Sequence, residues 1–306
     1  MCLISCKLRA KLSKCSAPIF FHLQSKKLDV VQLSTEQVRL QNLAEEAYAL
    51  FGRYQLKGLI QVCLCNVCMT QEQQRQLSIT PLRQIPVELI EEYSSSAHAI
   101  PANPDELKYI LPRYLELIAQ GTCPHDFSWE VCLSRFGEAR HIDASGPGVV
   151  RRGLALAGVR AAPAAIFSTE EAAFLDRFLF AVLDAIVAGK YPAEAEEALV
   201  MMGQAGTDIS GAVKRILNHP SDRGPDIVSE MVMESSYQII SERALRNPFW
   251  DNARSAMKSF AAELCAAATI EQLTQAVLVE TNAARAHRMS EAVTVLETAA
   301  AQNAGH

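Results

Sequence analysis

The sequence predicts an all-α protein, an irregular multi-helix bundle of about 8–10 helices with no substantial sheet. After residue 33, apolar residues recur at spacings of three and four, which is the pattern of helices that bury one face. Capping residues precede these stripes, and glycines follow several of them. The best strand patterns, Pro18–Leu23 and Asp29–Leu33, both lie before the first of these helices.

The helix starts are marked by capping residues. Capping-box spacing occurs in four pairs: Ser34 with Gln37, Thr70 with Gln73, Ser168 with Glu171, and Thr269 with Gln272. Proline follows a cap residue in Asn103-Pro104 and Asn247-Pro248, which predicts a helix start at each proline. Three glycines stand at C-terminal cap positions: Gly121, Gly137 and Gly189.

Between these signals the apolar stripes predict individual helices. The clearest stripes are Leu40–Phe51, Leu107–Ile118 and Phe174–Ile186. Pro112 falls inside the second stripe. Because proline removes a backbone donor and crowds the carbonyl of Lys108, we expect a kink or a break there.

Composition divides the chain into four parts. Residues 1–33 hold six basic residues and one acidic residue, a net charge of +5, which leaves about −10 for the rest of the chain. We expect a basic, poorly ordered tail; an arm that touches a nucleic acid or an anionic membrane is the alternative. Residues 137–165 contain five glycines and two prolines and predict a Gly-rich linker or loop. It separates a cysteine-bearing helical half, 34–136, from an alanine-rich helical half, 166–306.

Charge and hydropathy argue against several classes of protein. A net charge of −5 does not suit a nucleic-acid binder, which needs a concentrated basic surface. The longest apolar stretch, Phe178–Val187, is interrupted by Asp184, so we expect no membrane span. Nine cysteines without regular spacing, and without an export signal, predict free thiols in a reducing cytoplasm.

Chemistry concentrates where Cys63, Cys65 and Cys68 fall within six residues. Thiolates at C-x-C-x-x-C spacing can converge on one soft metal ion, and zinc is the expected ion. A closed zinc site needs a fourth ligand, which a residue after the 104–120 helix would supply if that helix folds back. The candidates for this ligand are Cys123, His125 and Cys132.

Two other interpretations of the cysteines stay open. Cys65 and Cys68 alone have the spacing of a redox pair, although no βαβ pattern precedes them. Alternatively, Cys63 and Cys68 are small buried apolar residues, because free cysteine is among the most buried residue types.

No other motif assembles a catalytic site. His125-Asp126 suggests a metal-dependent phosphohydrolase of the HD type, with His98 and Asp143 as its nearest partners, but the pair falls in a predicted turn. Glycine-rich phosphate loops, G-x-S-x-G and H-E-x-x-H are absent from the sequence. The acidic residues around 194–197 and 230–234 are most simply solvated helix faces. Enzymatic activity is therefore undecided, and its absence is favoured.

Four segments together resemble a known family. They are Cys65-Asn-Val-Cys68-Met69, Thr80-Pro-Leu-Arg83, Tyr93-Ser-Ser-Ser-Ala-His98 and Leu111-Pro-Arg-Tyr-Leu-Glu-Leu-Ile-Ala119. They are similar to a family of bacterial, all-helical proteins that has no assigned activity. The resemblance covers roughly residues 63–132 and, more weakly, 168–220, and it implies that 1–33 and 139–165 lie outside the shared core. Family members can be encoded near polymorphic-toxin loci.

These observations support two hypotheses of different kinds. The first is a cytoplasmic, helical protein that binds a macromolecule, as a toxin-neutralising or adaptor protein; its acidic charge suits a protein partner with a basic surface. The second is a small structural zinc-binding protein that uses the 63–68 cysteines. We expect no nucleic-acid partner and no membrane partner, and an unrecognised enzyme is a further alternative.

Overall fold

The computed structural model describes residues 33–65, 67–96, 103–140 and 167–303. In this part of the chain there are 13 α-helices and two 3₁₀ helices, with no strand, so the all-α prediction is confirmed. The number of helices exceeds the expected range because three of them are only six or seven residues long. The two strand patterns predicted before Ser34 lie outside the described residues, apart from Leu33.

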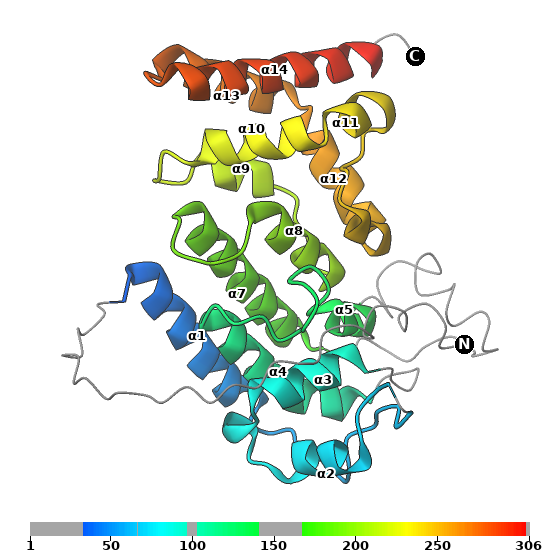
Figure 1. The fold of residues 1–306 in the computed structure, drawn as a ribbon. Helices are drawn as coiled ribbons and strands as arrows, with labels where there is room; N and C mark the ends of the chain where they lie inside the picture. Colours follow the sequence, from blue (N-terminus) through cyan, green and yellow to red (C-terminus); the bar gives the residue numbers. More distant parts are fainter. Residues whose placement is uncertain (1–32, 66, 97–102, 141–166, 304–306) are drawn as a thin grey trace, which may run out of the picture.

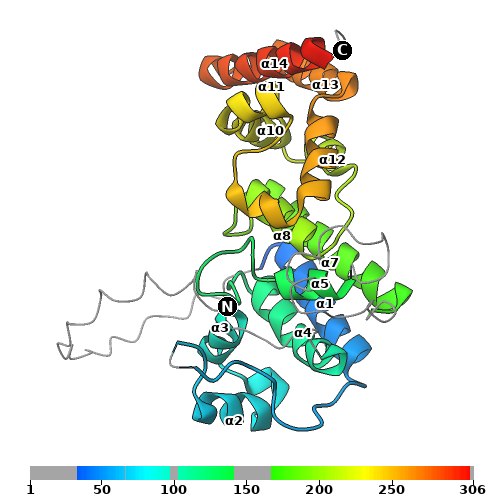
Figure 2. The same cartoon turned by 90° about the vertical axis from the view of Figure 1, so that its right-hand side faces the viewer.

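The helices form an elongated stack in which α2 and α3 lie near one end and α13 and α14 at the other (Figures 1 and 2). The first group comprises α1 (Thr35–Phe51), α2 (Gln71–Ile79), η1 (Leu82–Gln84), α3 (Val87–Ser95), α4 (Pro104–Ala119) and α5 (Ser134–Arg140). The second group begins with α7 (Thr169–Val187), α8 (Ala195–Gln204), α9 (Ala212–Leu217), α10 (Gly224–Glu234) and α11 (Ser236–Glu242). It ends with η3 (Pro248–Asn252), α12 (Arg254–Leu264), α13 (Ala267–Val279) and α14 (Ala283–Asn303).

Helix α1 packs against both α4 and α7 and joins the two halves of the chain (Figure 1). Phe51 at its end is buried, with its ring edge-on to Phe167 and Phe174 at centroid distances of 6.3 and 6.2 Å. Burial of three aromatic side chains at one contact makes this junction part of the main core. The apolar stripes of α1, α4 and α7 therefore face one another, as their spacing predicts.

Most predicted caps are confirmed. Ser34, Thr70 and Ser168 each form the complete reciprocal capping box. Asn103 caps α4, and the Asn247 side chain accepts from the Phe249 N–H, although the element that follows Asn247 is a 3₁₀ helix.

The fourth capping box is wrong. Helix α13 begins at Ala267, so Thr269 is already a buried residue of its first turn. The Thr269 hydroxyl donates to the carbonyl of Glu263 at 2.8 Å, which ties the start of α13 to the end of α12. Thr269 and Gln272 have the spacing of a capping box, but the Thr269 hydroxyl donates to a carbonyl of the preceding helix.

Helix α4 runs without a break through Pro112. Proline inside a helix costs about 3 kcal/mol, so packing must offset the lost hydrogen bond. Pro112 and most of the residues around it are buried against neighbouring helices. The following residue, Arg113, donates from Nε to the Ile85 carbonyl at 3.0 Å and from Nη1 to Glu116 at 2.6 Å.

The predicted glycine caps divide into two kinds. Gly121 and Gly189 adopt φ angles of +73° and +70° and end their helices as predicted. Gly137 lies inside α5, so its assignment as a cap is wrong. Helix α5 also takes up the first four residues of the predicted linker, and 141–166 lie outside the described residues.

Gly137 is required for close contact between α5 and the end of α8. A Cβ atom at this position would lie 1.6 Å from the carbonyl oxygen of Gln204. Because backbone atoms must move to relieve this clash, Gly137→Ala should lower the free energy of unfolding by about 3 kcal/mol. The control Ser134→Ala, in the same helix, adds no atom and should change it by less than about 0.5 kcal/mol. Urea unfolding of both variants measures the difference, and equal stabilities would contradict the contact.

Candidate metal centre

The cysteines lie in the loop between α1 and α2, and this loop is fixed before the first of them. The Ile60 N–H donates to Ser78 Oγ at 3.0 Å, and the Gln74 side chain donates to the Ile60 carbonyl at 2.8 Å. The Gln61 N–H donates to a carboxylate oxygen of Glu106 at 2.9 Å. The loop is therefore held on both α2 and α4 before it reaches Cys63.

The loop is also fixed after the last cysteine. Met69 is fully buried, and its N–H donates to Ser96 Oγ at 3.1 Å. Thr70 then caps α2. The three cysteines consequently occupy a short span whose two ends are anchored by side chains outside the cluster.

The thiols of Cys63, Cys65 and Cys68 converge, with all three Sγ atoms within 4.8 Å of one another. Cys63 and Cys68 are half-buried, whereas Cys65 is exposed. Tetrahedral zinc with Zn–S distances near 2.3 Å holds its sulfur ligands about 3.8 Å apart. Side-chain rotation can bring the cluster to that spacing, so the three residues fit a thiophilic ion.

Cys65 occupies an environment that favours the thiolate. The backbone N–H groups of Val67 and Cys68, followed by the thiols of Cys63 and Cys68, lower the pKa of Cys65 to about 7. The Cys68 N–H also lies 3.2 Å from the Cys65 carbonyl, which closes a tight turn between the two cysteines. N–H groups directed at a thiolate offset its negative charge, as they do around metal-bound sulfur.

The structure does not bring Cys123 or His125 into this cluster. Among the described residues, the group that could share an ion contains the three loop cysteines alone. Cys123 pairs with Cys132, the third candidate: their hydrogen bond lowers the pKa of Cys123, and burial raises that of Cys132. The Cys132 sulfur also lies 3.4 Å from Met201 Sδ.

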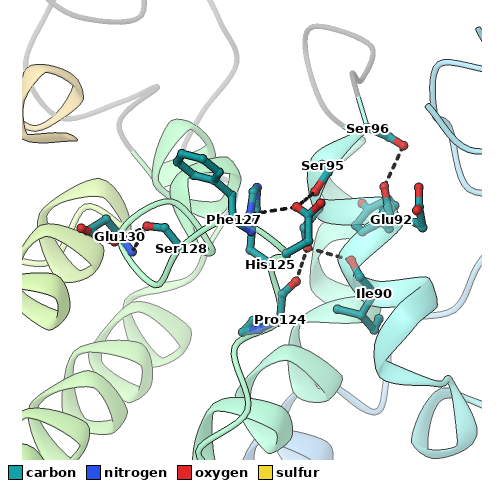
Figure 3. A network of polar contacts seen from close by, with 12 residues as sticks. Ile90, Glu92, Ser95, Ser96, Pro124, His125, Phe127, Ser128 and Glu130 are labelled. Carbon is teal, nitrogen blue, oxygen red and sulfur yellow. Dashed lines mark hydrogen bonds and ion pairs between the residues drawn. The ribbon is translucent and has the colours of Figure 1, made fainter. Parts of the chain in front are cut away.

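His125 takes part in the turn that follows α4 (Figure 3). Its Nδ1 accepts from the Phe127 N–H at 3.0 Å, and burial lowers its pKa. This turn is fastened to the end of α3, where Ser94 donates to the Pro124 carbonyl at 2.6 Å and Ser95 donates to Asp126.

Ser96, the residue that follows α3, holds the cysteine loop instead, because its hydroxyl accepts from the Met69 N–H. The hydrogen bonds of His125 and Asp126 are those of a turn, which agrees with the prediction that the pair falls in a turn. His98 and Asp143, the other members of the suggested HD site, lie outside the described residues.

The second half of the chain contains an acidic cleft that the sequence does not predict. A cleft of about 590 Å³ between α7, α8 and α10 is lined by Glu194, Glu196, Glu230 and Glu234, with Arg223 at its side. Three of these carboxylates are exposed as predicted, but Glu196 is half-buried and accepts from the Trp250 indole N–H at 3.0 Å. Burial raises the pKa of Glu196.

Spacing along α8 could not reveal the cleft, because Glu230 and Glu234 reach it from α10. Trp250, which holds Glu196 in place, comes from η3. The sequence signal for this contact was Trp250, because a buried indole N–H needs an acceptor.

No protein-family model, curated protein or solved structure matches this chain. The resemblance to a bacterial family therefore stays a prediction, and the geometry of the site carries the functional argument. Among the described helices, none is both long enough and apolar enough to cross a membrane.

Proposed function

We propose that this protein binds one zinc ion through Cys63, Cys65 and Cys68, and that the ion stabilises the loop between α1 and α2. The observation that carries the proposal is the convergence of three thiols within 4.8 Å in a loop anchored on both sides. Three protein ligands leave the fourth position of a tetrahedral ion for water or another donor.

The chemistry of the donors supports a soft or borderline metal ion. Thiolate ligands select zinc, copper(I) or iron–sulfur clusters over magnesium or calcium. The six cysteines among the described residues are in the reduced state, which suits the reducing cytoplasm in which we place the protein.

Elemental analysis of the full chain, purified without a chelating tag, tests the proposal. Wild type should carry about one zinc per chain, and C65S/C68S should carry none, because a single thiolate cannot hold the ion. The matched control is C123S, which removes a thiol outside the cluster and should keep its zinc. A wild-type protein that carries no metal after incubation with zinc would show that the cluster is not a metal site.

A second candidate function is the binding of a protein partner with a basic surface, in toxin neutralisation or as an adaptor. The acidic cleft supports this candidate, because four carboxylates and one guanidinium line it. Opposite charges speed association and fix the orientation of a complex, and salt screens them.

A short lysine-rich peptide is a defined probe for this cleft. Wild type should bind it in calorimetry at low salt, and binding should weaken as salt rises because exposed charges are screened. E230Q/E234Q should bind more weakly, whereas E242Q, which changes an exposed glutamate of α11, should bind like wild type. Equal binding by all three proteins would place the interaction outside the cleft.

A further inference from the structure

We propose that the cysteine cluster is also a site of oxidative modification, in which hydrogen peroxide joins Cys65 and Cys68 in a disulfide and releases the metal ion. The release step rests on the proposed function above. The disulfide step does not, because it requires only the two thiols and the turn between them.

The backbone selects this pair of thiols. The Cys68 N–H lies 3.2 Å from the Cys65 carbonyl, which is the hydrogen bond typical of a four-residue turn. Such a turn brings its first and last Cα atoms to less than about 7 Å, which overlaps the range of about 4.4–6.8 Å found for disulfides. The Sγ atoms are already within 4.8 Å, so side-chain rotation can complete the approach.

Access to solvent favours Cys65 as the thiol that is oxidised first. It is exposed, whereas Cys63 and Cys68 are half-buried. Cys63 precedes the turn, so the turn's hydrogen bond does not draw it toward Cys65. Cys68 is therefore the thiol that we expect to resolve an oxidised Cys65.

The reaction balances with peroxide as the two-electron oxidant. The Cys65 sulfur attacks one peroxide oxygen, the O–O bond breaks, and the leaving hydroxide takes a proton to give water and a sulfenic acid. The Cys68 sulfur then attacks the Cys65 sulfur and forms the S–S bond. The sulfenic hydroxide leaves and is protonated to a second water.

The consequence for the metal follows from the number of ligands that remain. Two of the three thiolates are consumed, and Cys63 alone cannot retain a zinc ion. The Met69 contact to Ser96 and the Thr70 cap involve no cysteine sulfur, so they persist in the oxidised protein. Oxidation should therefore release metal without unfolding the surrounding helices.

The experiment uses zinc-loaded, full-length protein treated with stoichiometric hydrogen peroxide. A chromogenic chelator reports released zinc, and mass spectrometry reports the tryptic peptide that spans residues 58–75 and contains all three cysteines. Wild type should release its zinc, and this peptide should lose two hydrogens. C63S leaves only Cys65 and Cys68 in the peptide and should lose two hydrogens as well. C68S should form no disulfide there and should instead be trapped by dimedone as a sulfenic acid at Cys65.

Each other outcome overturns a definite part of the inference. Zinc-loaded wild type that keeps its zinc and its reduced peptide shows that the cluster is not a peroxide-sensitive site. A disulfide between Cys123 and Cys132, found together with a reduced 58–75 peptide, would show that the peroxide-sensitive pair is Cys123 and Cys132 and not Cys65 and Cys68. If wild type never binds zinc, the proposed function and the release step are both wrong, whereas a Cys65–Cys68 disulfide in that protein still supports the modification.

Discussion

Replacing Glu171 with glutamine is expected to lower the free energy of unfolding by about 3–5 kcal/mol. The Glu171 side chain is fully buried at the start of α7 and holds a network of four donors. Arg53 Nη2 and the Tyr54 hydroxyl each lie 2.5 Å from Oε1, and Lys108 Nζ lies 2.9 Å from Oε2. The Ser168 N–H donates to Oε2 at 2.9 Å.

The size of this effect comes from the partners that remain. Lys108 is also buried, so neutralising Glu171 leaves an ammonium group without its counter-charge in a low-dielectric region. The neighbouring Glu170 is exposed on the same turn, and E170Q should change stability by less than about 1 kcal/mol. Urea unfolding at neutral pH compares the two variants. A loss in E171Q no larger than that in E170Q would show that the network contributes little.

The same network predicts a dependence of stability on pH. Burial raises the pKa of Glu171, but hydrogen bonds from Tyr54, Ser168 and Lys108 outweigh burial and lower it from 4.5 to about 2. Because the folded state holds the proton less tightly than the unfolded state, the stabilisation is present above pH 4.5 and is lost toward pH 2. Wild type should lose stability over this window more steeply than E171Q, and parallel curves would contradict the assignment.

Glu171 also shows where sequence analysis reaches its limit. The capping box of Ser168 and Glu171 depends on residues three apart, so spacing predicts it correctly. The partners Arg53 and Lys108 come from α1 and α4 and carry no periodic signal that points to Glu171. Local helix starts are therefore readable from the sequence, whereas a buried ion network requires the packing of distant helices.

The two wrong assignments have the same origin. Thr269 and Gly137 have the residue type and spacing of caps, but each serves a tertiary contact: a carbonyl of α12 for Thr269 and the backbone of Gln204 for Gly137. A glycine at a helix end and a glycine at a close helix crossing look alike in one sequence. Only the position of the second element distinguishes them.

The candidate metal site likewise has a part that the sequence predicts and a part that depends on distant packing. Cys63, Cys65 and Cys68 are neighbours in sequence, so the loop brings them together whatever the rest of the fold does. The expected fourth ligands depended on the path of the chain after α4, and that path places Cys123 beside Cys132 instead. The turn around His125 is held by hydrogen bonds from serines at the end of α3, and no sequence motif indicates these contacts.

The anchoring of the cysteine loop determines what a bound ion can contribute. Glu106 and Ser96 hold the two ends of the loop through backbone N–H groups, and neither contact involves a cysteine. The helices on either side are held by the main core, to which α1 contributes Phe51 and α2 contributes Leu77. A bound ion would therefore stabilise a loop that the fold already shapes, unlike the ion of a zinc finger, which creates its fold.

Removing the metal from wild type with a strong chelator is accordingly expected to destabilise the protein strongly but locally. For an ion that binds only the folded loop, the free energy of opening the loop falls by about 4 kcal/mol when the free zinc had been 1,000 times the Kd. Hydrogen exchange should accelerate in residues 59–70 and in α2, whereas α13 and α14 at the far end of the stack should keep their protection.

C65S/C68S is the matched control for this measurement, because it should already exchange rapidly in that loop and should not respond to the chelator. Uniform acceleration across both ends of the wild-type molecule would mean that the ion supports the whole fold. Unchanged exchange would mean that the thiols converge without a structural ion. A local response that only wild type shows would establish the ion as a stabiliser of the loop, because the chelator would then act through the cysteine thiolates alone.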